Sequence, residues 1–481
     1  IKQTKLIINM DYNKIGFKAG IEIHQQLEGL KLFCNCPAIN SDKKPDLKAE
    51  RQLRAVVGET GEVDVAAAHE MAKEKRFVYV SNSEDTCAID YDEEPPRNAN
   101  EHHLHTAIMV CKLLNADVVD ELQVMRKTVV DGSNVGGFQR TMLIGKNGWI
   151  ETSKGKVGIP TIFLEEEAAQ KLKSPDATVK YKLDRLGIAL LEITTDASLK
   201  DPEHVKETAT AIGMILRSTE RVKRGIGTIR QDVNVSIKKG DRVEVKGFQD
   251  LKSIPKVIAK EIERQQKLVS EDKEVKKEVR KANPDFSTTF MRPMPGGARL
   301  YPETDILPIR ITKDDIEKIK LPELLTEKSL KLEKEFGISD VMAKEVLKQK
   351  IDLSKYVKKF KLKADVIANI IINVPKDIKS RLGIDSSKLN ETDFMEVLEK
   401  LDKDEISKDA IEDVLVMKCE GKKVDYSKFK KADSADLEKG ISEIIKEKPG
   451  LNPGAYMGLV MAKFKGQVDG KKAMEILKKL L

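Results

Sequence analysis

Two residues near the start of the chain, Glu22 and His24, are of the types that bind metal ions or transfer protons. They lie in segment 17–24, where Ile21 and Ile23 alternate with them, and this period of two is typical of a β-strand. Side chains two residues apart on a strand point to the same face, so one face carries a carboxylate and an imidazole while the other is apolar. Such a pair can hold a cation or take part in proton transfer. An edge strand with a polar outer face would show the same pattern.

Four acidic residues further along the chain stand in strand-like segments among apolar or basic neighbours. They are Glu166, Glu192, Asp232 and Glu244. A carboxylate inside an apolar run, as Glu192 is, costs free energy when buried unless a cation, a metal or a hydrogen-bond donor meets it. With Glu22 and His24 these acids give six candidate ligands that suit Mg²⁺, the ion that neutralises phosphate charge in phosphoryl transfer. Taken singly, each acid also fits a salt bridge or a solvated face.

Basic residues recur in the same part of the chain: Arg126, Lys127, Arg140, Arg185, Arg230 and Lys246. Some of them are expected to hold phosphate or the acceptor end of a nucleic acid. The glycine-rich segment 131–137 has many backbone donors and little side-chain bulk, so it fits either a phosphate cradle or a hairpin turn. The sequence contains no Walker P-loop and no dinucleotide fingerprint. A bound ATP would therefore need a site built from strands and metal ions.

Composition narrows the class of protein. The chain has 481 residues, of which 40% are hydrophobic and 34% charged, and its net charge is +7. These values fit several folded domains and a nucleic-acid partner, without requiring one. No apolar run is long enough to cross a membrane, and no secretory leader opens the chain. The five cysteines are an odd number, which with the missing leader predicts a reducing, cytoplasmic location.

Cys34 and Cys36 are the only closely spaced cysteines. With Cys87 they could form part of a zinc site, but a fourth ligand at standard spacing is missing. No cysteine stands in a recognisable nucleophile context, so the sequence predicts no glutaminase centre in this chain.

The elements that must position these residues divide the chain into three parts. Residues 10–306 read as mixed strand and helix, an α/β (α+β) region with a largely antiparallel sheet, because strand-like runs follow one another with few helices between them. Strands are predicted at 77–80, 122–130, 141–144, 161–164, 188–194, 232–237 and 242–246, and helices at 100–114, 202–218 and 254–269. From about residue 314 apolar residues recur at helical spacing. This predicts a helical domain over 307–390 and a helical tail over 391–481.

Several long stretches of the sequence are similar to the GatB/GatE family, and to its archaeal branch in particular. They are residues 20–27, 31–37, 54–64, 92–96, 124–127, 131–134 and 137–141. The resemblance implies an enzyme that converts glutamate mischarged on tRNA(Gln) into glutamine. This subunit would bind Glu-tRNA(Gln), phosphorylate the glutamyl side chain with ATP and let ammonia displace the phosphate. A GatD-like, asparaginase-type partner protein would supply the ammonia, in a heterodimer or a dimer of heterodimers.

The resemblance also implies roles for the residues singled out above. His24, Glu166 and Glu192 resemble the ligands of one Mg²⁺. Glu22, Asp232 and Glu244 resemble a second cation set near the phosphates of ATP. Arg185, Arg230 and Lys246 are the candidates for binding phosphate.

The fold implied by the resemblance is a cradle-like catalytic domain, then a helical domain, then a tail resembling YqeY-type modules. The helical and tail domains would hold the body of the tRNA. The candidates for phosphate contact in the tail are Lys463, Lys465, Lys471 and Lys472. Each of these lysines, taken alone, also fits a solvated face.

One departure from the family concerns an inserted domain, similar to part of aspartyl-tRNA synthetase, that archaeal members usually carry before the segment matching 283–285. Here only a short charged helix, at about 270–281, is predicted in its place. Two other interpretations remain open. One is a non-catalytic tRNA-binding or assembly protein with a degenerate acidic site, and the other is a two-metal nuclease, which would cleave strands without ATP.

Overall fold

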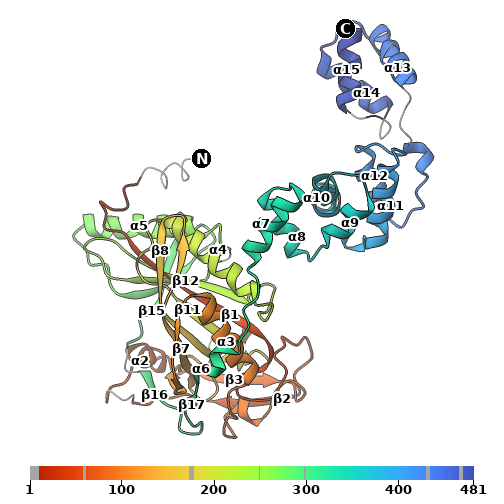
Figure 1. Ribbon diagram of the computed structural model, residues 1–481. Helices are drawn as coiled ribbons and strands as arrows, with labels where there is room; N and C mark the ends of the chain where they lie inside the picture. Colours follow the sequence, from red (N-terminus) through yellow and green to blue (C-terminus); the bar gives the residue numbers. More distant parts are fainter. Residues whose placement is uncertain are drawn as a thin grey trace. The chain divides into compact units, whose positions relative to one another are not determined.

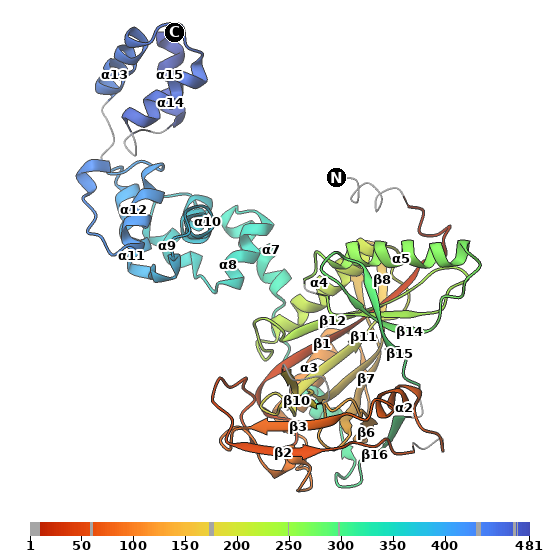
Figure 2. The same ribbon diagram turned by 180° about the vertical axis from the view of Figure 1, so that it is seen from behind.

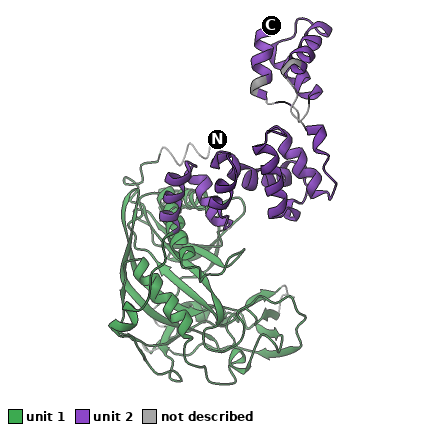
Figure 3. Cartoon of the chain, turned by 45° about the vertical axis from the view of Figure 1, so that its right-hand side comes forward, with its two compact units in different colours: residues 1–324 green, residues 325–481 purple. Residues whose placement is uncertain are grey.

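The long strand β1 (Lys18–Lys31) lies inside the largest sheet and carries both Glu22 and His24. Its alternation with the fully buried Ile21 and Ile23 confirms the strand expected from the sequence. The computed structural model describes residues 10–57, 61–172, 178–248, 250–296, 299–429, 434–464, 468 and 470–481. The chain forms two compact units, residues 1–324 and residues 325–481 (Figure 3).

Eleven strands of the described residues form the largest sheet, in the order β15-β14-β13-β12-β1-β11-β8-β7-β6-β16, with β4 paired to β7 (Figure 1). Besides β1 they are β4 (Asp117–Val118), β6 (Met125–Thr128), β7 (Phe138–Thr152), β8 (Gly155–Glu166), β11 (Ile188–Thr194), β12 (Ile229–Ser236), β13 (Val243–Lys246), β14 (Glu278–Ala282), β15 (Thr288–Pro293) and β16 (Leu300–Pro302). Neighbours pair antiparallel except β13 and β14, which are parallel. The prediction of a largely antiparallel sheet is therefore confirmed.

Three helices pack on one face of this sheet: α3 (Glu101–Leu113), α4 (Pro202–Ser218) and α5 (Ile254–Ser270). Figure 2 shows α4 and α5 together beside the strands. Ile21 and Ile23 belong to the apolar core that these helices share with the sheet. Asp201 caps α4 by accepting the backbone N–H of His204 at 2.9 Å. Because the helices occupy the isoleucine face of β1, its opposite face is left to polar groups.

A smaller sheet of the first unit has the order β2-β3-β10-β9. Its strands are β2 (Leu47–Arg51), β3 (Arg76–Ser81), β9 (Gln170–Leu172) and β10 (Thr178–Lys182). It has its own aromatic core, in which the rings of Tyr79 and Tyr181 stack with centroids 6.1 Å apart. The short helix α2 (Val65–Met71) precedes β3, and β5 (Glu121–Leu122) pairs with β17 (Ile309–Arg310).

The second unit is helical, as predicted. Its α-helices are α7 (Leu325–Phe336), α8 (Asp340–Lys348), α9 (Leu353–Lys359), α10 (Ala364–Leu382), α11 (Glu391–Asp402), α12 (Ala410–Cys419), α13 (Ser434–Glu447), α14 (Pro453–Lys463) and α15 (Gly470–Leu480). Among the helices that the structure describes, none combines the length and apolar character needed to cross a lipid bilayer.

The structure divides the chain at different places from the sequence prediction. The first unit extends past 306/307, because the segment with α6 (Lys313–Glu317) packs Ile316 and Ile319 on the main core. Helices on both sides of 390/391, from α8 to α12, share one apolar core, whereas α13 to α15 surround another. The assignment of separate functions to these parts stays a prediction.

The predicted helix at 270–281 is wrong. Ser270 is the last residue of α5, Asp272 adopts a left-handed conformation with φ 57°, and β14 follows. Val275 and Val279 are buried in a core with strand β13, so pairing with the sheet overrides the helical propensity of this charged segment. The predicted strand 122–130 is also divided, into β5 and β6. The other predicted strands and the three predicted helices overlap observed elements.

Candidate active site

The pairing of β1 with its two neighbours brings acids from distant parts of the chain together. In register, His24 is opposite Glu192 of β11, and Glu22 is opposite Asp232 of β12. With side chains of β8 and β13 they line one cavity, called here the acidic cavity. Its acidic residues and histidine are Glu22, His24, Glu165, Glu167, Glu192, Asp232 and Glu244. Five of the six predicted ligands therefore converge on one cavity.

One group of potential ligand atoms in the acidic cavity belongs to His24, Glu165 and Glu192, within 4.8 Å of one another. His24 Nε2 lies 3.3 Å from Glu192 Oε2. The ammonium group of Lys127 donates to Glu165 Oε2 at 2.7 Å and lies 3.8 Å from Glu192 Oε2. The arrangement offers two carboxylates and one imidazole, a donor set that suits Mg²⁺ or Mn²⁺.

A second group belongs to Glu22, His24 and Asp232, also within 4.8 Å of one another. Lys246 donates to Asp232 Oδ2 at 2.6 Å and forms an ion pair with Glu244. Asn234 donates to Glu22 Oε1 at 3.0 Å. The two groups share His24, so a pair of neighbouring cations would fit around this imidazole.

The crowding of carboxylates shifts their protonation. Burial, and then repulsion from Glu244 and Glu192, raises the pKa of Glu22. Burial opposes the charge of Glu192, but Lys127 and His24 outweigh it and hold its pKa below the usual range. Burial lowers the pKa of His24, but Glu192 and the other carboxylates outweigh it, so that the net pKa is raised. The carboxylates of the two ligand groups repel one another, and divalent cations bound between them would relieve this repulsion.

Glu166 does not belong to the acidic cavity, which corrects its assignment as a ligand. It continues the buried face of Ile162 and Leu164 in β8, whereas Glu165 lies on the other face. Its carboxylate accepts from the Arg140 backbone N–H at 3.1 Å and from the Arg140 guanidinium at 3.3 Å. The sequence did contain a signal for this. Ile162, Leu164 and Glu166 alternate along β8, so Glu165 and not Glu166 lies on the face opposite to the apolar residues.

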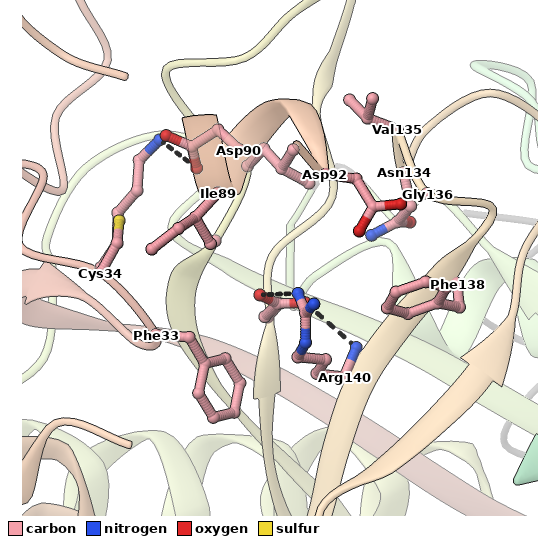
Figure 4. Close-up of a pocket in the computed structure, with 14 residues that line it drawn as sticks. Phe33, Cys34, Ile89, Asp90, Asp92, Asn134, Val135, Gly136, Phe138 and Arg140 are labelled. Atoms are coloured by element: carbon pink, nitrogen blue, oxygen red, sulfur yellow. Dashed lines mark hydrogen bonds and ion pairs between the residues drawn. The ribbon is translucent and has the colours of Figure 1, made fainter. Parts of the chain in front are cut away.

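Glu166 lines a different, small cavity on that face, called here the Arg140 cavity (Figure 4). The guanidinium of Arg140 lies 5.0 Å from the ring centroid of Phe138 and 5.9 Å from that of Phe33. Arg140 also donates to Glu303 at 2.8 Å, and the side chain of Glu303 is fully buried. This network stabilises the sheet, and it lies on the face of β8 opposite to the acidic cavity.

The three predicted phosphate-binding residues are all engaged in the structure. The guanidinium of Arg185 donates to the carbonyls of Ala168 and Ala169, each at 2.8 Å, and Arg185 does not line the acidic cavity. Arg230 lines the cavity but forms a two-pronged ion pair with Glu167, at 3.0 Å for one prong. Lys246 is held by the ion pairs with Asp232 and Glu244.

Sequence reasoning missed several residues of the acidic cavity. These are Glu165, Glu167, Gln139, Arg242, Arg292 and Arg299. Strand periodicity could have identified Glu165, but nothing local marks the three arginines. They reach the cavity from the start of β13, from β15 and from the segment after β15, and the sheet order decides this proximity.

Three cysteines and one aspartate form a further cluster. Potential ligand atoms of Cys34, Cys36, Cys87 and Asp90 lie within 4.8 Å of one another. Asp90 is the fourth potential ligand, which the sequence did not reveal because the standard zinc spacings are those of cysteine and histidine. Its carboxylate also lies 3.0 Å from the buried ammonium of Lys31.

Other predicted binding features have ordinary structural partners. Segment 131–137 is the turn of the β6–β7 hairpin, and a Cβ at Gly132 would meet the Phe77 ring at 2.2 Å. In the tail, Lys463 forms an ion pair with Glu443 at 2.9 Å. Lys465 and the side chains of Lys471 and Lys472 lie outside the described residues.

Comparison with known proteins adds a family context to this geometry. Residues 17–317 match the family described as GatB/GatE catalytic domain, and residues 352–481 match the family described as GatB domain. The chain is 36% identical to the GatE component of the glutamyl-tRNA(Gln) amidotransferase of Methanocaldococcus jannaschii, over 98% of this chain and 100% of that protein. It is 33% identical to the corresponding proteins of Methanosarcina barkeri and Archaeoglobus fulgidus, over 98% of this chain and 98% and 99% of those proteins.

The relatives are longer than this chain. The alignment with the Methanocaldococcus jannaschii protein extends over 628 positions, against 481 residues here. That relative therefore contains residues without a counterpart in this sequence.

Proposed function

The chain belongs to the GatB/GatE family, and we propose that it phosphorylates the glutamyl side chain of Glu-tRNA(Gln) with ATP and then transfers the activated glutamyl group to ammonia. The product would be Gln-tRNA(Gln). The observation that carries this proposal is the convergence of carboxylates from β1, β8, β11, β12 and β13 on one cavity that also contains arginines.

A carboxylate is a poor acyl donor to ammonia, because hydroxide or oxide would have to leave. Transfer of the γ-phosphoryl group of ATP to the glutamyl Oε gives an acyl phosphate and releases ADP. Ammonia then attacks the carbonyl carbon, phosphate leaves with the bonding electrons, and the added nitrogen loses a proton to give the amide. The reaction needs strong charge compensation around phosphate and a site that keeps water away from the acyl phosphate.

The residues present fit divalent cations. His24, Glu165 and Glu192 would hold one ion, and Glu22, Asp232 and Glu244, with His24 close by, would hold a second. When bound, such ions would neutralise phosphate charge and orient the transferring group. Lys127 and Lys246 already lie among these carboxylates. Their ammonium groups are placed to contact phosphate oxygens or the substrate carboxylate when the ion pairs rearrange.

The ammonia would come from an asparaginase-type partner protein, in a heterodimer or a dimer of heterodimers in the cytoplasm. The chemistry of this chain supports a division of labour, since Cys34, Cys36 and Cys87 are grouped with Asp90 and not with a histidine base. The helical unit would bind the body of the tRNA, as the match of residues 352–481 to the GatB domain suggests by family membership.

The decisive experiment uses the purified chain with Glu-tRNA(Gln), ATP, Mg²⁺ and free ammonium, without a partner protein. We expect Gln-tRNA(Gln), and none when ATP or Mg²⁺ is omitted. Hydrolysis of ATP without amidated product would reject the transamidation role. Binding of tRNA without either reaction would favour a non-catalytic assembly protein, and strand cleavage without ATP would favour a nuclease.

A further inference from the structure

Arg242 is held in an unusual way at the edge of the acidic cavity. It stands directly before β13, and its Nε and Nη2 donate to the thioether sulfur of Met294 at 3.3 Å and 3.0 Å. A thioether is a weak and neutral acceptor. The contact therefore orients the guanidinium without compensating its charge, and the side chain remains exposed to the cavity.

Arg292 and Arg299 lie in the same part of the molecule. Both line the acidic cavity and also a smaller cavity that Asp64 and Asp131 line as well. Both are only half-buried. Arg299 contributes to the lowered pKa of Glu192, which places its positive charge near the ligand cluster.

These three arginines differ from the other cations of the cavity. Lys127, Lys246 and Arg230 each form an ion pair with a carboxylate. Within the part of the chain that the structure describes, no carboxylate lies within 4.0 Å of the guanidinium of Arg242, Arg292 or Arg299. In a cavity so rich in carboxylates, guanidinium groups without such partners are free to bind an incoming anion.

We propose that Arg242, Arg292 and Arg299 form a phosphate-binding wall of the acidic cavity. The ligand chemistry is a phosphate oxygen, either of a nucleoside triphosphate or of the terminal phosphodiesters of an RNA acceptor end. A guanidinium presents two parallel donors to such a group. The assignment rests on the proposed function, which supplies both sources of phosphate. It replaces Arg185 and Arg230, whose guanidinium donors are already engaged, and adds to Lys246.

The test measures binding, so that it does not depend on turnover. Three variants, Arg242→Gln, Arg292→Gln and Arg299→Gln, are titrated by calorimetry with a non-hydrolysable ATP analogue and Mg²⁺, with magnesium tripolyphosphate, and with an RNA minihelix carrying the acceptor stem. Arg97→Gln is the matched control, because Arg97 is exposed and does not line the acidic cavity. Loss of a charge-assisted contact should weaken the affected ligand about tenfold or more.

The pattern of losses identifies the source of phosphate. Weaker binding of the nucleotide analogue and of tripolyphosphate assigns the wall to the triphosphate. Weaker binding of the minihelix alone, with a smaller salt dependence of its affinity, assigns it to RNA. Affinities that all stay within about twofold of those of Arg97→Gln overturn the proposal.

Two further measurements separate ligand contact from a structural role and from failure of the proposed function. Met294→Leu removes the sulfur acceptor but keeps Arg242, so it should leave phosphate affinity within about twofold. If Met294→Leu weakens phosphate binding as much as Arg242→Gln does, the role of Arg242 is its structural contact with Met294 and not contact with phosphate. Tripolyphosphate binding tests the wall even if no amidated product forms, so the two proposals can fail separately.

Discussion

Glu165 and Glu166 are adjacent in β8 but face opposite sides of the sheet. Glu165 lies in the acidic cavity, 2.7 Å from the ammonium of Lys127. Glu166 accepts hydrogen bonds from Arg140 on the other side. One position along a strand therefore separates a candidate metal ligand from a residue that stabilises the sheet.

Substitution of the two glutamates should have different effects. We expect Glu165→Gln to weaken Mn²⁺ binding at least about tenfold, because it removes a charged oxygen donor. Glu166→Gln should keep Mn²⁺ affinity but lower the free energy of unfolding by roughly 1–3 kcal/mol, since buried Arg140 loses one charged partner. Electron paramagnetic resonance of Mn²⁺ and urea unfolding measure the two quantities. Loss of Mn²⁺ only in Glu166→Gln would reverse the assignment.

His24 and Glu192 should be needed for phosphorylation and not for tRNA binding. Their contact at 3.3 Å lies inside the ligand cluster, so His24→Ala and Glu192→Gln should each lower the rate of Glu-tRNA-dependent ATP hydrolysis by about a hundredfold or more. Filter binding should give an unchanged Kd for tRNA. A matching loss of tRNA affinity would instead make these residues part of the scaffold.

The cysteine cluster predicts a bound zinc ion. Three cysteine sulfurs and the carboxylate of Asp90 give the four ligands that a structural zinc ion takes, and elemental analysis of the purified protein should find about one zinc per chain. Cys87→Ser and Asp90→Asn should reduce this content and lower the melting temperature. Cys419→Ala, which changes a buried thiol of the helical unit, is the control. Metal-free protein of unchanged stability would contradict the prediction.

The tail should contribute to tRNA affinity rather than to chemistry. The shared core of α8 to α12 shows that a chain ending at residue 390 would lose buried side chains such as Phe394 and Val397 from this core. A chain ending at Phe429 keeps that core. We expect it to increase KM for Glu-tRNA(Gln) about tenfold while kcat at saturation changes little. An unchanged KM would remove the tail from tRNA binding.

Stability should depend on pH through His103 of α3. Burial is the main cause that lowers its pKa from 6.5 to about 4, and the charges of His102 and Lys223 act in the same direction. The hydrogen bond that its Nε2 donates to the Leu30 carbonyl raises the pKa but does not outweigh burial. Between these pH values the unfolded chain binds a proton that the native chain does not. The free energy of unfolding should therefore decrease as pH falls from about 6.5 to about 4, in total by about 3 kcal/mol.

The measurement compares urea unfolding of the wild type with His103→Gln across this pH range. In the variant, the slope of the free energy of unfolding against pH should be smaller by the contribution of about one proton. His105→Gln, on an exposed position of the same helix, should retain it. Equal slopes for the wild type and His103→Gln would show that the buried imidazole does not control acid stability.

The sequence by itself determined the elements with strong local signals. The alternation around Glu22 and His24 fixed β1 and its two faces, and Asp201 with Pro202 fixed the start of α4. The long motifs identified the family, and five of the six chosen ligands do meet in the acidic cavity. These features depend on periodicities and caps that span only a few residues, so they can be read without knowledge of the fold.

Only the tertiary structure decided which charges meet. His24 and Glu192 are 168 positions apart in the chain, and their contact depends on the register between β1 and β11. The same sheet engages Arg230 with Glu167 and leaves Arg242 with Met294. Asp90 joins the cysteines, and β14 replaces a predicted helix, for the same reason. Ion pairs and strand pairing are set by neighbours far away in sequence, and local patterns carry no information about them.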